Sequence, residues 1–189
     1  MNKNKLLTLL LILIYQTSYS QFKFEREYRV SLKEVPVQAI DFVRRAKFKK
    51  KVKWFVEESQ EGKTFEAKVN HNGNKHSLEF NEKGEVLDIE VKVKFSSLSE
   101  TVKGNVSSIL KKRFRKYRIK KVQLQFTGRG EELIKCLQTT CGLQPKFELI
   151  VKGKDKKRYQ KFEFLFNEEG NKVLRELKFL PDNYDNLEF

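Results

Sequence analysis

The sequence contains few of the residues from which metal and redox centres are built. Its 189 residues include two His, two Cys and one Met. It also contains no Gly-x-Ser-x-Gly, no His-Glu-x-x-His and no phosphate-cradling Gly-rich loop. Carboxylates are common, but on the expected strands they alternate with lysine, which is typical of ion pairs on a wetted sheet surface. We therefore expect no catalytic residues, no cofactor and no metal site.

The two histidines, His71 and His76, flank an expected hairpin turn at Asn72-Gly73. A two-residue turn would place the imidazoles diagonally on one face, about 7 Å apart. A metal ion would need a third ligand from elsewhere in the chain. We interpret the pair as exposed side chains at the end of a hairpin.

No apolar stretch is long enough to cross a bilayer. Residues 6–15 form an apolar run interrupted only by Thr8, about half the length that a spanning helix needs. Two lysines precede this run, and serines occupy the −3 and −1 positions of a cut between Ser20 and Gln21. This pattern predicts a signal peptide over residues 1–20 rather than a membrane anchor. The mature protein should be periplasmic or extracellular.

An oxidising compartment changes the interpretation of the cysteines. Cys136 and Cys141 are separated by four residues, which is neither the redox-active nor the zinc-binding spacing. An even pair in an exported chain favours a structural disulfide that closes a small loop. Two free thiols or an intermolecular bridge are the alternatives.

The mature chain shows one order of elements twice. Residues 35–48 have helical spacing of apolar residues, and alternation predicts strands near 52–57, 65–69, 76–80 and 87–93. The order returns with a helix over about 97–118 and strands near 122–126, 147–151, 162–166 and 173–179. Phe80-Asn-Glu-Lys-Gly84 also reappears as Phe166-Asn-Glu-Glu-Gly170. We expect an α+β fold of two tandem units, each one helix packed on a four-stranded antiparallel meander sheet.

We place unit 1 at residues 21–95, unit 2 at 96–181 and an acidic tail at 182–189. Five segments of the chain carry a resemblance to a known family: Val35-Pro36, Trp54-Phe55, Asn72-Gly73, the segment 80–87 and its copy at 166–170. In these segments the chain resembles the PepSY-like, or beta-lactamase-inhibitor-like, family of exported bacterial proteins. The resemblance covers roughly residues 30–180 and implies tandem helix-plus-strand units without a catalytic motif. The chain departs from the family in being very basic, and in having Ser97-Leu-Ser99 where an apolar-Pro helix start is usual.

Positive charge is the unusual feature of the composition. Lys and Arg number 40 against 25 Asp and Glu, a formal net charge of +15. Two clusters follow the two expected helices. Their members are Arg44, Arg45, Lys47, Lys49, Lys50, Lys51 and Lys53, and then Lys111, Lys112, Arg113, Arg115, Lys116, Arg118, Lys120 and Lys121. They could stabilise the C-termini of the helices and keep the protein soluble, or they could form a surface for an anionic partner.

From these features we expect a non-enzymatic exported module that binds an envelope protein or peptide, or is inhibitor-like, as the family resemblance implies. The alternative is that the two basic clusters bind anionic envelope polymers or a membrane surface. A structural or regulatory domain without a separate ligand is a third possibility. We expect no nucleic acid partner, because the compartment is wrong and no nucleic-acid-binding motif is present.

Overall fold

A computed structural model describes residues 21–139, 141–155 and 157–180. The expected signal peptide (1–20) and acidic tail (182–189) lie outside these residues. The ten strands are β1 (Gln21–Lys23), β2 (Glu25–Arg29), β3 (Lys53–Ser59), β4 (Gly62–His71), β5 (Asn74–Phe80), β6 (Val86–Val93), β7 (Tyr117–Phe126), β8 (Lys146–Asp155), β9 (Arg158–Phe166) and β10 (Val173–Phe179). The helices are α2 (Val37–Arg45), α3 (Glu100–Arg113) and α4 (Gly130–Gln138), with short 3-10 turns η1 (Leu32–Glu34) and η2 (Phe95–Ser97).

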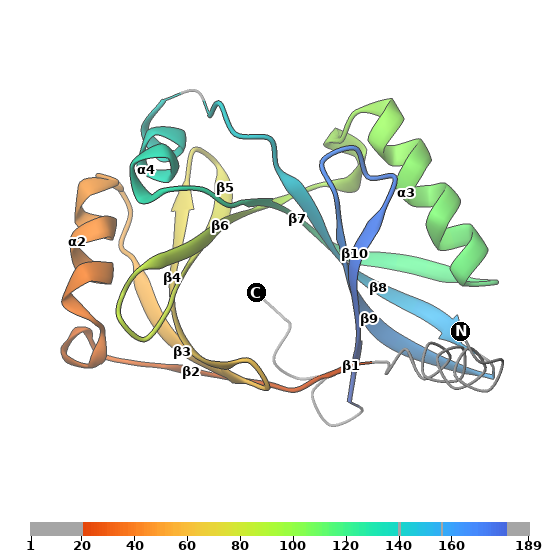
Figure 1. Cartoon of the computed structure of the whole chain (residues 1–189), viewed down its shortest axis with the longest axis horizontal. Helices are drawn as coiled ribbons and strands as arrows, with labels where there is room; N and C mark the ends of the chain where they lie inside the picture. The colour runs from red at the N-terminus through yellow and green to blue at the C-terminus, as the bar shows by residue number, and fades with distance from the viewer. Residues whose placement is uncertain (1–20, 140, 156, 181–189) are drawn as a thin grey trace, which may run out of the picture.

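All ten strands belong to one sheet, in the order β1-β10-β9-β8-β7-β6-β5-β4-β3-β2. The strands at its two edges, β1 and β2, are consecutive in sequence and joined through Phe24. β1 pairs with β10 in parallel and β2 pairs with β3 in antiparallel orientation. One N-terminal segment therefore bridges both edges and bends the sheet into a near-barrel, which we call the strand ring (Figure 1).

This architecture corrects the expected fold class. Over the residues that the structure describes, the fold is one ten-stranded sheet with three helices, not two tandem units of one helix on four strands. β6 and β7 pair in register from Ile89–Phe126 to Val93–Val122, so the strands of the two expected units form one continuous sheet. The sequence analysis also missed the strands of residues 21–29 and helix α4. The internal repeat and the division of the chain at residue 95 stay predictions.

The helices lie outside the ring and cover its apolar face (Figure 1). Two cores result. α2 and α4 pack on the first strands, where Trp54, Phe80 and Leu133 are buried. α3 packs on the later strands, where Phe164 and Leu110 are buried. Because side chains alternate along a strand, the residues between these apolar positions point to the inside of the ring.

The two similar turns after β5 and β9 hold the sheet against its helices. In each turn the side-chain oxygen of an asparagine, Asn81 in the first and Asn167 in the second, accepts hydrogen bonds from two backbone N–H groups. Each turn ends at a glycine with positive φ, Gly84 at 84° and Gly170 at 67°. A Cβ on Gly84 would lie 2.8 Å from a backbone nitrogen of α2, so only glycine permits this close approach.

Candidate binding chamber inside the strand ring

The inside of the ring contains a cavity of about 350 Å³ lined by charged side chains. We call it the chamber. Ten carboxyl side chains line it against four cationic ones, an excess of six, and these ten are among only 25 acidic residues in the chain. The acids are Glu25, Glu27, Glu57, Glu61, Glu66, Glu79, Asp88, Glu90, Glu148 and Glu163; the cations are Lys23, Lys68, Lys121 and Arg175.

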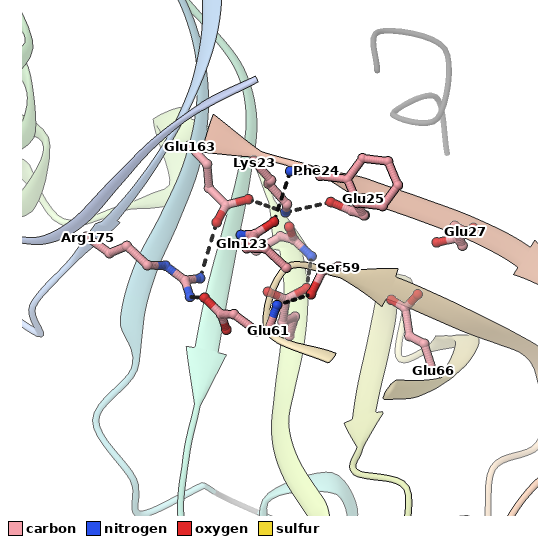
Figure 2. A network of polar contacts seen from close by, with 12 residues as sticks. Lys23, Phe24, Glu25, Glu27, Ser59, Glu61, Glu66, Gln123, Glu163 and Arg175 are labelled. Atoms are coloured by element: carbon pink, nitrogen blue, oxygen red, sulfur yellow. Dashed lines mark hydrogen bonds and ion pairs between the residues drawn. The ribbon is translucent and has the colours of Figure 1, made fainter. Parts of the chain in front are cut away.

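The N-terminal segment closes the chamber through ion pairs. Lys23 Nζ lies 2.5 Å from an oxygen of Glu163 and 2.7 Å from one of Glu25. Arg175 reaches the other oxygen of Glu163 at 3.2 Å and Glu61 at 3.4 Å (Figure 2). Since Glu163 is only 1% exposed, these contacts place a paired charge in the wall of the ring.

A second group of contacts lies between β2 and β4. Lys68 pairs with Glu27 on β2 and, at 3.0 Å, with Glu66 on its own strand. Burial alone would lower the pKa of Lys68, but the two carboxylates outweigh it and the pKa is raised. The ammonium of Lys68 therefore stays charged and links the N-terminal segment to the sheet on this side.

Other chamber carboxyls are driven toward their protonated form. Burial, reinforced by Glu25, raises the pKa of Glu57 to about 10. Burial, reinforced by Asp88, raises the pKa of Glu90 to about 8. The pKa values of Asp88 and Glu148 are also raised well above their ordinary range, mainly because both side chains are buried. These carboxyl groups therefore stay largely protonated near neutral pH, because neighbouring cations do not compensate for their burial.

A smaller pocket of about 180 Å³ adjoins the chamber and shares Glu66, Lys68, Ser77 and Lys121 with it. We call this pocket the lysine mouth. It is lined by Lys51, Lys53, Lys68, Lys75, Lys92 and Lys121, with Glu66 as its one carboxylate among the described residues. Partial burial and the neighbouring Lys75 and Lys121 lower the pKa of Lys92. Anionic groups would relieve this crowding of positive charge.

The structure brings together only some of the predicted basic residues. Lys51 and Lys53 from the first cluster and Lys121 from the second line the lysine mouth. The other twelve are exposed outside it, and three of them pair with acids: Arg44 with Asp41, Arg45 with Glu131, and Arg113 with Glu176. Sequence reasoning missed Lys75, Lys92 and every acidic residue of the chamber. The available signal was the charged residues alternating with apolar ones along each strand.

The two histidines were expected to be exposed at the end of a hairpin, but neither of them is exposed. His71 is half-buried, with its Nε2 2.8 Å from the carbonyl oxygen of Leu137 on α4. His76 is buried, and its ring centroid lies 5.4 Å from that of His71. Burial lowers the pKa of His76. Within the described ranges, no group of three or more His, Cys, Asp or Glu is arranged to hold a metal ion.

The predicted disulfide is present between Cys136 and Cys141. It joins the end of α4 to the segment that follows. The cysteines were expected to close a small loop, but the first of them lies within a helix, in which Leu133, Ile134 and Leu137 make a buried face against the first core. The disulfide therefore belongs to a packed helix rather than to an isolated loop.

Comparison with known proteins identifies the fold but not a partner. No protein-family model matches the chain, and no curated protein is detectably similar to it. Among solved structures, a DUF2874 family protein from Bacteroides ovatus has a TM-score of 0.55 at 18% identity, over 82% of this chain and 94% of that one. A candidate periplasmic protein from Bacteroides eggerthii has a TM-score of 0.53 at 17% identity, over 81% and 94%.

A BLIP-like protein from Bacteroides fragilis aligns at 16% identity over 82% of this chain and 92% of that one. Its TM-score of 0.49 is too low to support an inference about binding. The first two likenesses show a shared fold, and the resemblance to the PepSY-like family stays a prediction. No helix in the described part of the chain is long and apolar enough to cross a membrane.

Proposed function

We propose that the protein is a non-enzymatic, exported binding module that receives a charged group of an envelope protein or peptide inside its strand ring. The observation that carries the proposal is the chamber itself. A closed sheet ordinarily fills its interior with apolar side chains, whereas this ring keeps its apolar face outside, under the helices, and its charged face inside. Such an interior provides polar recognition groups on rigid strands.

The fold supports the same function. The proteins of similar structure include one considered periplasmic, in agreement with the signal peptide expected from residues 1–20. Five carboxylates of the chamber, Glu25, Glu27, Glu61, Glu66 and Glu163, already have lysine or arginine partners. These pairs fix the wall and leave the remaining acids to face an incoming ligand.

Site-specific photo-crosslinking in the native envelope tests this function. A photoreactive residue at Ser77, which lines both the chamber and the lysine mouth, should give a defined protein or peptide adduct. The same residue at Ser108, exposed on α3, is the matched control. Folding of both variants is checked by circular dichroism. The proposal is rejected if a folded Ser77 variant gives no adduct beyond that of the Ser108 control.

A second candidate function is binding of an anionic envelope polymer at the lysine mouth. The observation that favours it is the convergence of both basic clusters in one pocket, through Lys53 and Lys121. Affinity for polyphosphate or a sulfated polysaccharide should then fall steeply between about 50 and 200 mM salt.

Two double variants with the same change of charge test whether the polymer binds at the lysine mouth or responds only to the overall charge of the protein. Lys53→Gln with Lys121→Gln should weaken polymer binding several-fold more than Lys111→Gln with Lys112→Gln, which alters the exposed end of α3. Equal weakening by the two pairs would show that overall charge, rather than the mouth, attracts the polymer.

A further inference from the structure

Five adjacent strands each contribute one lysine to the lysine mouth. The strands β3 to β7 are neighbours in the sheet (Figure 1). Together with Lys51, which precedes β3, their lysines line one pocket, and we call these six residues the lysine arc: Lys51, Lys53, Lys68, Lys75, Lys92 and Lys121. Because each strand supplies one ammonium group from the same face of the sheet, the arc is held by backbone pairing rather than by a loop.

Lys92 lies within the arc, on the strand between those that carry Lys75 and Lys121. In the β6–β7 register it is directly opposite Gln123, and Lys121 is two residues from Gln123 on the same face of β7. Diagonal neighbours of this kind are about 7–8 Å apart, which long side chains can span. Burial, then the charges of Lys75 and Lys121, lower the pKa of Lys92. The three ammonium groups therefore lie close enough to repel one another.

The residues of the pocket balance only part of this positive charge. Glu66 is the one carboxylate among the described residues that line it, against six lysines, an excess of five positive charges. That carboxylate is already in an ion pair with Lys68, which also pairs with Glu27. A ligand with more than one negative charge would therefore relieve the repulsion better than a singly charged one.

The kind of cation indicates the kind of anion. Apart from His76, the basic residues that line the mouth are lysines, with no arginine among the described ones. A planar guanidinium group matches a planar carboxylate, whereas lysines act as separate point charges that can surround a tetrahedral phosphate. A phosphomonoester has a second pKa of about 6, so it carries nearly two negative charges at neutral pH. A carboxylate, a sulfate ester or a phosphodiester carries one.

We propose that the lysine mouth binds the phosphate group of a phosphomonoester through Lys75, Lys92 and Lys121. This inference rests on the second candidate function, anion binding at the mouth, and names the group that is bound. Lys51 and Lys53 are exposed, whereas Lys92 and Lys121 are half-buried, so the phosphate enters from the surface and meets partly desolvated ammonium groups. The phosphomonoester is either a free molecule or the head group of a lipid.

Isothermal titration of the mature protein at pH 7.5 tests the free source with a matched pair of probes. Glucose 6-phosphate should give a saturable heat. Glucose 6-sulfate has nearly the same size but one negative charge instead of two, so it should bind at least about fivefold more weakly.

Co-sedimentation with vesicles tests the lipid source. Phosphatidylcholine vesicles that contain phosphatidic acid, a phosphomonoester, should bind more protein than vesicles with the same fraction of phosphatidylglycerol, a phosphodiester. Preference for phosphatidic acid without binding of glucose 6-phosphate identifies a lipid head group as the source, and binding of glucose 6-phosphate identifies a free molecule. The inference fails if neither phosphomonoester is preferred over its control.

Single variants place the phosphate in the mouth. Lys92→Gln removes one ammonium group and should raise the Kd for the bound probe about tenfold. Lys83→Gln, in an exposed turn outside the mouth, makes the same change of charge and should leave the Kd unchanged. Circular dichroism checks folding, and Lys75→Gln at an exposed position gives the same test if Lys92→Gln does not fold. A folded variant at either position that binds as tightly as the unaltered protein would overturn the inference.

The double variants of the polymer experiment separate this inference from the function on which it rests. If neither phosphomonoester is preferred but polymer binding still depends on Lys53 and Lys121, this inference alone is wrong. If polymer binding is weakened equally by the mouth pair and by the Lys111 and Lys112 pair, the proposed anion binding at the mouth is wrong.

Discussion

Replacing Lys23 by methionine should loosen the closure of the strand ring. The Lys23 ammonium is 2.5 Å from Glu163 and 2.7 Å from Glu25. It joins the N-terminal segment to β9, a strand 140 residues away in sequence. Methionine keeps the apolar stem of lysine and removes only the charge and its donors.

The size of the effect follows from the partners that remain. Removing one member of a buried ion pair destabilises a protein by about 3–5 kcal/mol when the other charge is left uncompensated. Here Arg175 stays 3.2 Å from Glu163, so that carboxylate keeps one cation, and the desolvation cost of Lys23 is no longer paid. We therefore expect a loss of about 2 kcal/mol in the free energy of unfolding.

Urea unfolding at pH 7 measures this loss. Trp54 is the one tryptophan of the chain and is 5% exposed, so its fluorescence reports on the core, with circular dichroism as a second probe. Lys83→Met, in an exposed turn, should change stability by less than about 0.5 kcal/mol. In a double-mutant cycle, Lys23→Met and Glu163→Gln should show a coupling of about 1–3 kcal/mol. A loss below about 0.5 kcal/mol for Lys23→Met would show that backbone pairing alone closes the ring.

Three further predictions concern the core, the buried acids and the disulfide. Trp54→Ala should cost about 3–5 kcal/mol by urea unfolding followed by circular dichroism, and a loss below about 1 kcal/mol would contradict the buried position. The pKa values of Glu90 (about 8) and Glu57 (about 10) lie above their unfolded values, so the folded state holds protons that the unfolded chain has lost. The protonated carboxyls contribute fully to folding stability below about pH 4.5, and this contribution is lost as the pH rises through about 8 to 10. The melting temperature should therefore fall between pH 6 and 9, and fall less steeply in Glu57→Gln. A melting temperature that rises over this range would refute the raised pKa values. Cys136→Ser with Cys141→Ser should cost at most about 2–3 kcal/mol and speed limited proteolysis after α4, and equal cleavage would show that the bridge orders nothing.

The sequence predicted local structure well where alternation was regular. Phe65, Ala67 and Val69 were expected on one face of a strand and are buried on one face of β4. The turn at Asn72-Gly73 was expected as a hairpin and joins β4 to β5, with positive φ at both residues. In both cases the signal lies within a few residues of the structure that it specifies.

The errors arose where the structure depends on distant partners. Residues 21–29 become strands because they reach β10 and β3 at once, and nothing within that segment names those partners. Helix α4 was missed because the cysteine pair led us to interpret this part of the chain as a small loop. The sequence correctly placed the alternating acids on the face of the sheet opposite to the apolar residues. It did not show that this face is enclosed, because the enclosure depends on pairing between strands at opposite ends of the chain.

The separation of charge between the outside and the inside of the ring constrains any single ligand. The exposed cations act through solvent, where fields decay over about 8 Å at physiological salt, whereas the buried chamber carboxylates are screened far less. A ligand approaching the lysine mouth therefore meets positive charge first and favours anionic groups there. Beyond Lys68 and Lys121, which both pockets share, it meets an excess of carboxyl groups, several of them protonated, and a cation there would favour their ionised form. One ligand that fills both pockets would therefore carry an acidic group where it crosses the mouth and a cationic group at the inserted end, because neither charge alone suits both environments.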